Sequence, residues 1–147
     1  MTLHPDFKEF IESLNKNEVE YLLVGGYAVV IYGYVRATGD MDFWVNNSPE
    51  NSIRVIEALK EFGFNFPDLD SSTIQQDDLV LQLGYPPYRI DIITTPSGVD
   101  FDICYPKREI FQLEDELSIN VIDLDSLKQN KRSTGRNKDL DDIENLP

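Results

Sequence analysis

The stretch that decides the fold is VGGYAVVIYGYVRATGDMDFWV, which spans residues 24–45. It contains a glycine pair, an apolar segment that can form a helix, and two aspartates, Asp40 and Asp42, at the start of a strand-forming run. On a β-strand, residues i and i+2 point to the same face, so both carboxylates would converge beside a semi-buried sheet. Isolated charge is costly there, and a divalent cation between the side chains is one arrangement that tolerates it.

Hydrophobic spacing and turn residues predict the elements around this stretch. Helices are expected over residues 5–14, 27–34, 48–62, 123–132 and 136–146, and strands over residues 20–24, 41–45, 79–83, 88–94, 109–113 and 117–122. The helix 48–62 has Ser48 as its N-cap, Pro49 at its first position and Gly63 at its end, with Ile53 on its apolar face. Residues 64–76 are expected to form a loop, and residues 99–108 give no clear signal. The pattern predicts one α/β or α+β domain over residues 1–147.

Composition excludes several classes of protein. Hydrophobic residues make up 41% of the 147 residues, which suits a folded domain, and no apolar run approaches the ~20 residues of a membrane span. With 27 acidic and 13 basic residues, the net charge of −14 argues against general DNA binding. The N-terminus lacks the features of a signal peptide, and the one cysteine, Cys104, is expected to be a buried thiol. A cytoplasmic location is expected.

Asp-x-Asp occurs five times, so the pattern alone proves nothing. The pairs lie at 40/42, 68/70, 100/102, 123/125 and 139/141. Residues 68 and 70 lie in a polar loop, 123 and 125 suit the start of a helix, and 139 and 141 diverge on a helix. The pair 100/102 competes with 40/42 if its segment is extended. Only 40/42 leads into an apolar strand.

A third carboxylate strengthens the choice of Asp40 and Asp42. Asp91 lies in the apolar strand segment RIDII, and it would reach the same cation if this strand neighbours residues 41–45. Alternatively, Asp91 pairs with Arg89 or Arg36.

The glycine pair suggests a contact with phosphate. Gly25 and Gly26 come between a predicted strand and a helix, where the main chain can approach a ligand closely. Neither a Walker A loop nor a Gly-x-Gly-x-x-Gly motif is present. A tight turn would also explain two glycines.

Taken together, the glycine pair, the helix, Asp40-x-Asp42 and the later Asp91 resemble the nucleotidyltransferase superfamily (DNA polymerase β-like). The stretch LLVGGYAVVIYGYVRATGDMDFWV is most similar to the small prokaryotic branch of AbiEii-type toxins, and the tail VIDLDSLKQNKRSTGRNKDLDDIENL resembles the end of those proteins. The resemblance covers residues 20–146. It implies a minimal nucleotidyltransferase fold, a mixed β-sheet flanked by helices with two helices at the C-terminus.

The resemblance also implies roles for particular residues. Asp40, Asp42 and Asp91 would hold Mg²⁺ or Mn²⁺, with Asp91 as ligand or general base. Many members have Gly-Ser where this chain has Gly25-Gly26, so only a backbone contact with the triphosphate would remain and phosphate affinity would be weaker. The candidate phosphate ligands are Gly25, Gly26, Arg36, Thr38, Lys128 and Lys131. For the basic cluster of the tail, which includes the two lysines, the alternative is a solvated helix face that offsets Asp139, Asp141 and Asp142.

The implied reaction moves a nucleoside monophosphate from an NTP to a hydroxyl acceptor, which would be a protein, tRNA or a small molecule such as an antibiotic. A catalytically silent binding module or toxin–antitoxin component, with a protein partner or as a homodimer, is the second hypothesis. The third is an acidic α/β domain whose aspartates pair with local bases.

Overall fold

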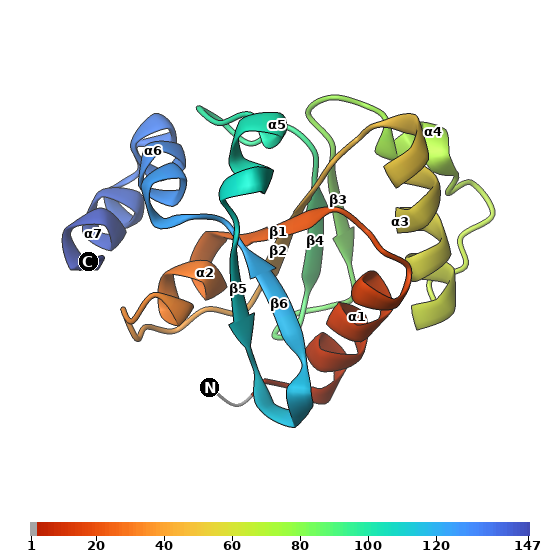
Figure 1. Cartoon of the computed structure of the whole chain (residues 1–147), viewed down its shortest axis with the longest axis horizontal. Coiled ribbons are helices and arrows are strands. Elements are labelled where there is room, and N and C mark those ends of the chain that lie inside the picture. Colours follow the sequence, from red (N-terminus) through yellow and green to blue (C-terminus); the bar gives the residue numbers. More distant parts are fainter. Residues whose placement is uncertain (1–2) are drawn as a thin grey trace.

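Six strands form one mixed sheet in the order β3-β4-β2-β1-β6-β5 (Figure 1). The structure, a computed structural model, describes residues 3–147 apart from the side chain of residue 115. The strands are β1 (Tyr21–Val24), β2 (Met41–Val45), β3 (Val80–Leu83), β4 (Ile90–Ile93), β5 (Glu109–Gln112) and β6 (Ser118–Val121). In the centre, β1 pairs antiparallel with β2 and parallel with β6, and β2 pairs parallel with β4. The outer strands β3 and β5 are antiparallel to β4 and β6.

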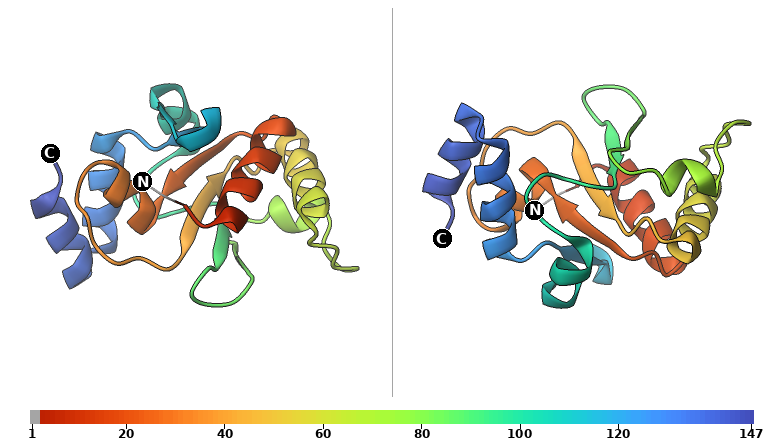
Figure 2. Two further views of the ribbon diagram at one scale, coloured as in Figure 1. Left: turned by 90° about the horizontal axis from the view of Figure 1, so that it is seen from below. Right: turned by 90° about the horizontal axis from the view of Figure 1, so that it is seen from above.

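Helices cover the sheet and its two ends. Within the described residues they are α1 (Pro5–Lys16), α2 (Gly25–Ile31), α3 (Pro49–Phe62), α4 (Ser71–Ile74), α5 (Phe101–Cys104), α6 (Leu124–Thr134) and α7 (Asn137–Asn145), with short 3₁₀ turns η1 (Tyr105–Lys107) and η2 (Glu114–Glu116). The C-terminal pair, α6 and α7, lies at the end of the molecule opposite α3 and α4 (Figures 1 and 2). No helix of the described chain has the length and apolar character needed to cross a membrane.

The two faces of the sheet are distinguished by alternate residues of β2. Phe43 contacts Phe10 of α1, with ring centroids 5.2 Å apart, so this face carries α1. Trp44 contacts Phe101 of α5 on the other face, also with centroids 5.2 Å apart. Because residues i and i+2 of a strand share a face, Asp42 lies on the side of Trp44. The carboxylate is therefore turned away from the large aromatic core beneath α1.

Helix ends largely follow the predicted signals. The Ser48 side chain accepts a hydrogen bond from the Asn51 N–H, and Gly63 ends α3 in the left-handed conformation with φ 114°. Asp123 caps α6 by accepting from the Ser126 N–H, as expected for an acid at a helix start. Cys104 is buried, as predicted.

Several local predictions are wrong. The helix predicted over residues 27–34 begins at Gly25 and ends at Ile31, and the loop predicted over 64–76 includes α4. The segment 99–108 forms α5 and η1, so Asp100 is a cap that accepts from the Asp102 N–H and the 100/102 pair is not extended. Ile53 is 56% exposed and therefore lies outside the buried face of α3, which includes Val55, Ile56 and Leu59.

Candidate active site

Asp42 and Asp91 lie side by side on neighbouring strands. β2 and β4 run parallel with Asp42 opposite Asp91, and the charge of Asp91 acts on the carboxyl group of Asp42. Asp40 lies one residue before β2, where the predicted strand over residues 41–45 also leaves it. The expected neighbouring of the two strands is therefore confirmed, and Asp91 does reach Asp42.

The carboxyl group of Asp42 is held in an unfavourable environment for negative charge. Its pKa is raised to about 6, first by burial and then by the charges of Asp91 and Asp40, while Lys131 acts in the opposite direction. Like-charged carboxylates that share a site raise one another's pKa in this way. A cation placed among these groups would relieve the repulsion.

Arg89 links the other two carboxylates. Its Nη2 donates to Asp40 Oδ2 at 2.7 Å and to Asp91 Oδ2 at 3.2 Å, and its Nε donates to Asp91 Oδ1 at 3.0 Å. Pairing of Asp91 with Arg89, one of the two alternatives from the sequence, is thus present together with the contact between Asp91 and Asp42. The three aspartates are connected in one cluster with a single guanidinium.

The cluster supplies the oxygen donors that Mg²⁺ prefers, but it is not arranged as a finished metal site. Among the residues that the structure describes, no three His, Cys, Asp or Glu side chains are grouped so that they could hold a metal ion. Asp40 and Asp91 face the guanidinium of Arg89 instead. The chemistry of the donors fits a divalent cation, and their present arrangement requires Arg89 to move.

Gly25 and Gly26 allow the main chain to pass next to this cluster. A Cβ atom on Gly25 would lie 2.1 Å from Asp42 Oδ2, and one on Gly26 would lie 2.4 Å from Thr38 Oγ1. Gly25 also has φ +70°, which glycine adopts at little cost. A side chain at either position would therefore have to displace Asp42 or Thr38. At seven residues, α2 is too short for its N-terminus to define an anion site by itself.

A polar pocket of about 250 Å³ opens beside the cluster. It is lined by Gly26, Arg36, Ala37, Thr38, Gly39, Asp40, Asp42 and Lys138. Pockets that bury a whole small ligand usually measure ~300–1,000 Å³, so this one suits part of a nucleotide. A larger hollow of about 510 Å³, lined by residues including Phe62, Tyr85 and Tyr88, contains none of the predicted site residues.

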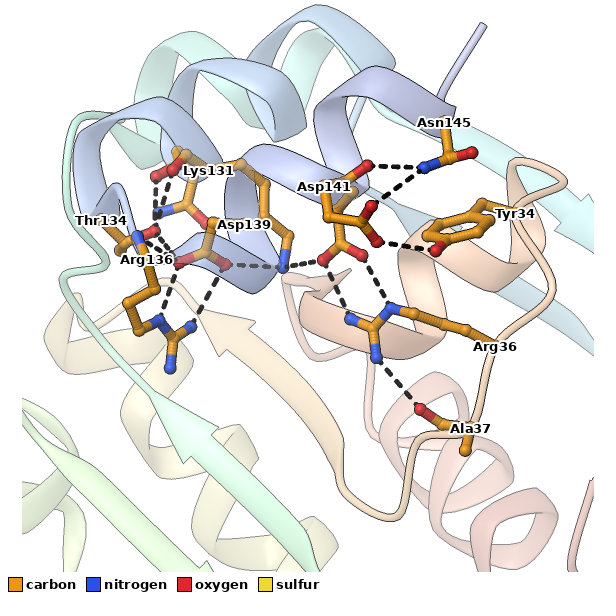
Figure 3. A network of polar contacts seen from close by, with 11 residues as sticks. Tyr34, Arg36, Ala37, Lys131, Thr134, Arg136, Asp139, Asp141 and Asn145 are labelled. Atoms are coloured by element: carbon orange, nitrogen blue, oxygen red, sulfur yellow. Dashed lines mark hydrogen bonds and ion pairs between the residues drawn. The ribbon is translucent and has the colours of Figure 1, made fainter.

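Two basic residues of the tail, Lys131 and Arg136, belong to a network of ion pairs between α6, α7 and the segment before β2 (Figure 3). Lys131 Nζ lies 3.2 Å from Asp139 Oδ1 and 3.0 Å from Asp142 Oδ2, and Lys131 is only 4% exposed. Arg36 donates twice to Asp142, at 2.7 and 2.9 Å. The solvated helix face considered for Lys131 is wrong about exposure, because this side chain is buried, but its offset of Asp139 and Asp142 is confirmed.

Asp139 is the most strongly bonded acid in that network. Burial by itself opposes its ionisation, but hydrogen bonds from Arg136, Thr134 and Lys131 outweigh this and lower the pKa of Asp139. Asp141, two residues along α7, points elsewhere and accepts a hydrogen bond from Tyr34 Oη at 2.7 Å. The predicted divergence of residues 139 and 141 is confirmed. Lys128 donates to the main-chain oxygen of Pro147, away from Lys131's partners.

Sequence reasoning gave too little weight to Arg89 and did not assign roles to Lys138, Asp139 and Asp142. Arg89 appeared only as an alternative partner of Asp91, although Arg89-x-Asp91 has the spacing that places both side chains on one face of an extended segment. Lys138, exposed on α7, lines the pocket with Asp40 and Asp42. The spacing of Asp139 and Asp142, three apart on a helix, is the sequence signal for their shared face.

Comparison with known proteins supports the fold. No protein-family model and no curated protein matches the sequence. The structure is similar to the crystal structure, at 1.87 Å resolution, of a "putative nucleotidyltransferase" from Thermotoga maritima, with a TM-score of 0.64 and 13% identity over 97% of this chain and 93% of the other. At this identity the likeness shows the fold, so the chain has the mixed sheet and flanking helices of a nucleotidyltransferase fold.

Proposed function

We propose that this protein is a metal-dependent nucleotidyltransferase that moves a nucleoside monophosphate from an NTP to a hydroxyl acceptor. The observation that carries the proposal is the pairing of Asp42 with Asp91 across β2 and β4, beside a pocket that contains Gly26 and Lys138. A scaffold would gain no stability from placing three carboxylates around one guanidinium. The fold of the Thermotoga maritima protein gives independent support.

The pocket suggests where the triphosphate would bind. Gly26 leaves the main chain accessible, Thr38 offers a hydroxyl, and Lys138 and Arg36 bring positive charge to the same lining. Lys131 is buried, so its effect on the site would be electrostatic, through its nearness to Asp42. Lys128 and Gly25 complete the proposed nucleotide-binding residues, Gly25 by permitting the approach of Asp42.

Asp40, Asp42 and Asp91 would hold the cation, Mg²⁺ or Mn²⁺. When bound, such a cation neutralises charge on the triphosphate and the departing pyrophosphate. Asp91 would take the proton of the acceptor hydroxyl as a general base. Asp42, whose pKa is raised, would be drawn to its charged form by the same positive charge.

The acceptor is a hydroxyl of a protein, of tRNA or of a small molecule such as an antibiotic. The net charge of −14 favours a cationic acceptor over tRNA. Membership of the AbiEii-type branch and a cytoplasmic location belong to the same proposal, whereas a toxin–antitoxin component belongs to the alternative of a catalytically silent module.

Titration calorimetry with ATP, CTP, GTP and UTP in the presence of Mg²⁺ tests the proposal. We expect the wild type to bind at least one NTP, and Asp42→Asn to lose that binding. Lys138→Met should weaken binding about tenfold through loss of a charged contact. Arg132→Met, which removes an exposed charge from α6 outside the pocket, should leave binding unchanged. Absence of binding by all four NTPs, with Asp42→Asn indistinguishable from the wild type, would refute the proposal.

A catalytically silent nucleotidyltransferase-fold module is the second candidate, and one observation favours it. Arg89 already neutralises part of the charge on Asp40 and Asp91, as expected in a protein that never binds a cation. A silent module would bind a partner or a nucleotide without release of pyrophosphate. A pyrophosphate-release assay with mixed acceptors separates the two candidates.

A further inference from the structure

Arg89 occupies the space that a cation would need. Its guanidinium lies between Asp40 Oδ2 and both oxygens of Asp91, at 2.7 to 3.2 Å. Mg²⁺ binds carboxylate oxygens at about 2.1 Å, and Mn²⁺ takes the same oxygen donors. A cation shared by Asp40 and Asp91 and the guanidinium therefore cannot be there together.

The surroundings of Arg89 allow it to leave. Its side chain is 26% exposed and Asp40 is 38% exposed, whereas Asp91 is only 8% exposed. Arg89 lies just outside β4, one residue before Ile90. Its side chain can therefore move without breaking main-chain hydrogen bonds between strands. Loss of the guanidinium alone would leave Asp91 buried beside Asp42 with no counter-charge from this side, and the departure therefore has to be coupled to the arrival of another cation.

We propose that Arg89 is a competitor built into the site, which the divalent cation must displace from Asp40 and Asp91 in order to bind. This inference rests on the proposed function. A monovalent ion brings no more charge than the guanidinium and lacks its directed N–H donors, so it cannot replace Arg89 at the two carboxylates of Asp40 and Asp91. A divalent ion brings twice the charge. Arg89 thereby makes the site selective for divalent over monovalent cations.

Binding of Mn²⁺ without nucleotide, followed by electron paramagnetic resonance, tests the inference without any activity measurement. Arg89→Gln removes the competitor, and we expect it to bind Mn²⁺ at least about tenfold more tightly than the wild type, the scale of one charge-assisted hydrogen bond. Arg89→Lys keeps the charge but loses the two-pronged geometry, so it should fall between the two. Na⁺ should compete with Mn²⁺ more strongly in Arg89→Gln than in the wild type.

Two further variants make the result decisive. Arg54→Gln removes an exposed arginine on α3, and it should bind Mn²⁺ as the wild type does, which excludes a general effect of net charge. Equal or weaker Mn²⁺ binding by Arg89→Gln and Arg89→Lys would overturn the inference and leave the proposed function standing. Mn²⁺ binding that does not depend on Asp42 in any variant, tested with Asp42→Asn, would overturn the proposed function as well. If Arg89→Gln fails to fold, Arg89→Lys decides the question alone.

Discussion

Two clusters of acidic residues, close enough to influence one another, have opposite charge balances. Around Asp139 and Asp142, three cations (Arg36, Lys131 and Arg136) face two buried carboxylates. Around Asp40, Asp42 and Asp91, only Arg89 forms ion pairs within the described part of the chain. The pKa of the fully buried Asp139 is lowered, whereas that of the less buried Asp42 is raised to about 6.

The difference shows that burial alone does not reveal a functional acid. Asp139 is more buried than Asp42, but its donors compensate for the loss of water and make it a structural residue. The neighbour of Asp42 on the adjacent strand is the carboxyl group of Asp91, at a position where a hydrogen-bond donor would be expected. An acid that remains under-compensated in a folded protein is the stronger candidate for ligand binding.

The largest expected effect comes from removing the central cation of the balanced cluster. Lys131→Met leaves Asp139 and Asp142 buried with less counter-charge, and breaking such a pair typically costs about 3–5 kcal/mol. Urea denaturation measures the free energy of unfolding. Arg132→Met, the exposed neighbour, should change it by less than about 0.5 kcal/mol. A small effect of Lys131→Met would mean that Arg36 and Arg136 alone compensate the charges of Asp142 and Asp139, and the contrast between the clusters would weaken.

A smaller effect is expected where the main chain approaches the under-compensated cluster. Gly25→Ala should lower the free energy of unfolding by about 2–4 kcal/mol, because the new Cβ would lie 2.1 Å from Asp42 Oδ2 and the residue has φ +70°. Gly135 has the similar φ of +65° and only an ordinary contact at 3.5 Å, so Gly135→Ala reports the backbone strain alone. Equal losses of unfolding free energy in the two variants, measured by urea denaturation, would show that the Asp42 side chain moves aside at no energetic cost.

The smallest expected effect is on the pH dependence of the free energy of unfolding, and it has opposite signs in the two clusters. Between about pH 4 and 6, Asp42 keeps its proton in the folded protein but loses it in the unfolded chain. The folded state then binds more protons, so Asp42 makes stability fall as pH rises through this range. Relative to the wild type, the free energy of unfolding of Asp42→Asn should therefore be higher by up to about 2 kcal/mol above pH 6 and almost unchanged near pH 4. Urea titrations in the presence of EDTA measure this difference.

Asp139 provides the matched comparison. Its pKa is lowered in the folded protein, so its contribution to stability is present above the ordinary pKa of an aspartate and is lost as pH falls below it. The loss caused by Asp139→Asn should accordingly shrink on acidification. A parallel pH dependence of the two variants would contradict the assignment of opposite charge balance.

Much of the site was predictable from short-range patterns. The strand at Met41–Val45, the N-cap at Ser48 and the pairing of residues 79–83 with 88–94 follow from alternation, capping and turn residues. The sharing of Arg89 by Asp40 and Asp91 was not predictable, because it depends on the pairing of β2 with β4, which is far away in the chain. The burial of Lys131 was missed because its partners come from α7 and its neighbours from the segment before β2, which meet only in the folded chain.

The sequence by itself determined the six strands and the longer helices, the acidic character of the chain and the candidate carboxylates, because these depend on residues close together in the chain. Only the tertiary structure decided that Asp91 lies opposite Asp42, that Arg89 stands between Asp40 and Asp91, and that Lys131 belongs to a different cluster. The physical reason is that charge compensation is a property of side chains in contact. The register of β2 against β4 brings together Arg89 and Asp40, which are 49 residues apart in the sequence. The docking of α7 brings together Arg36 and Asp142, which are 106 residues apart.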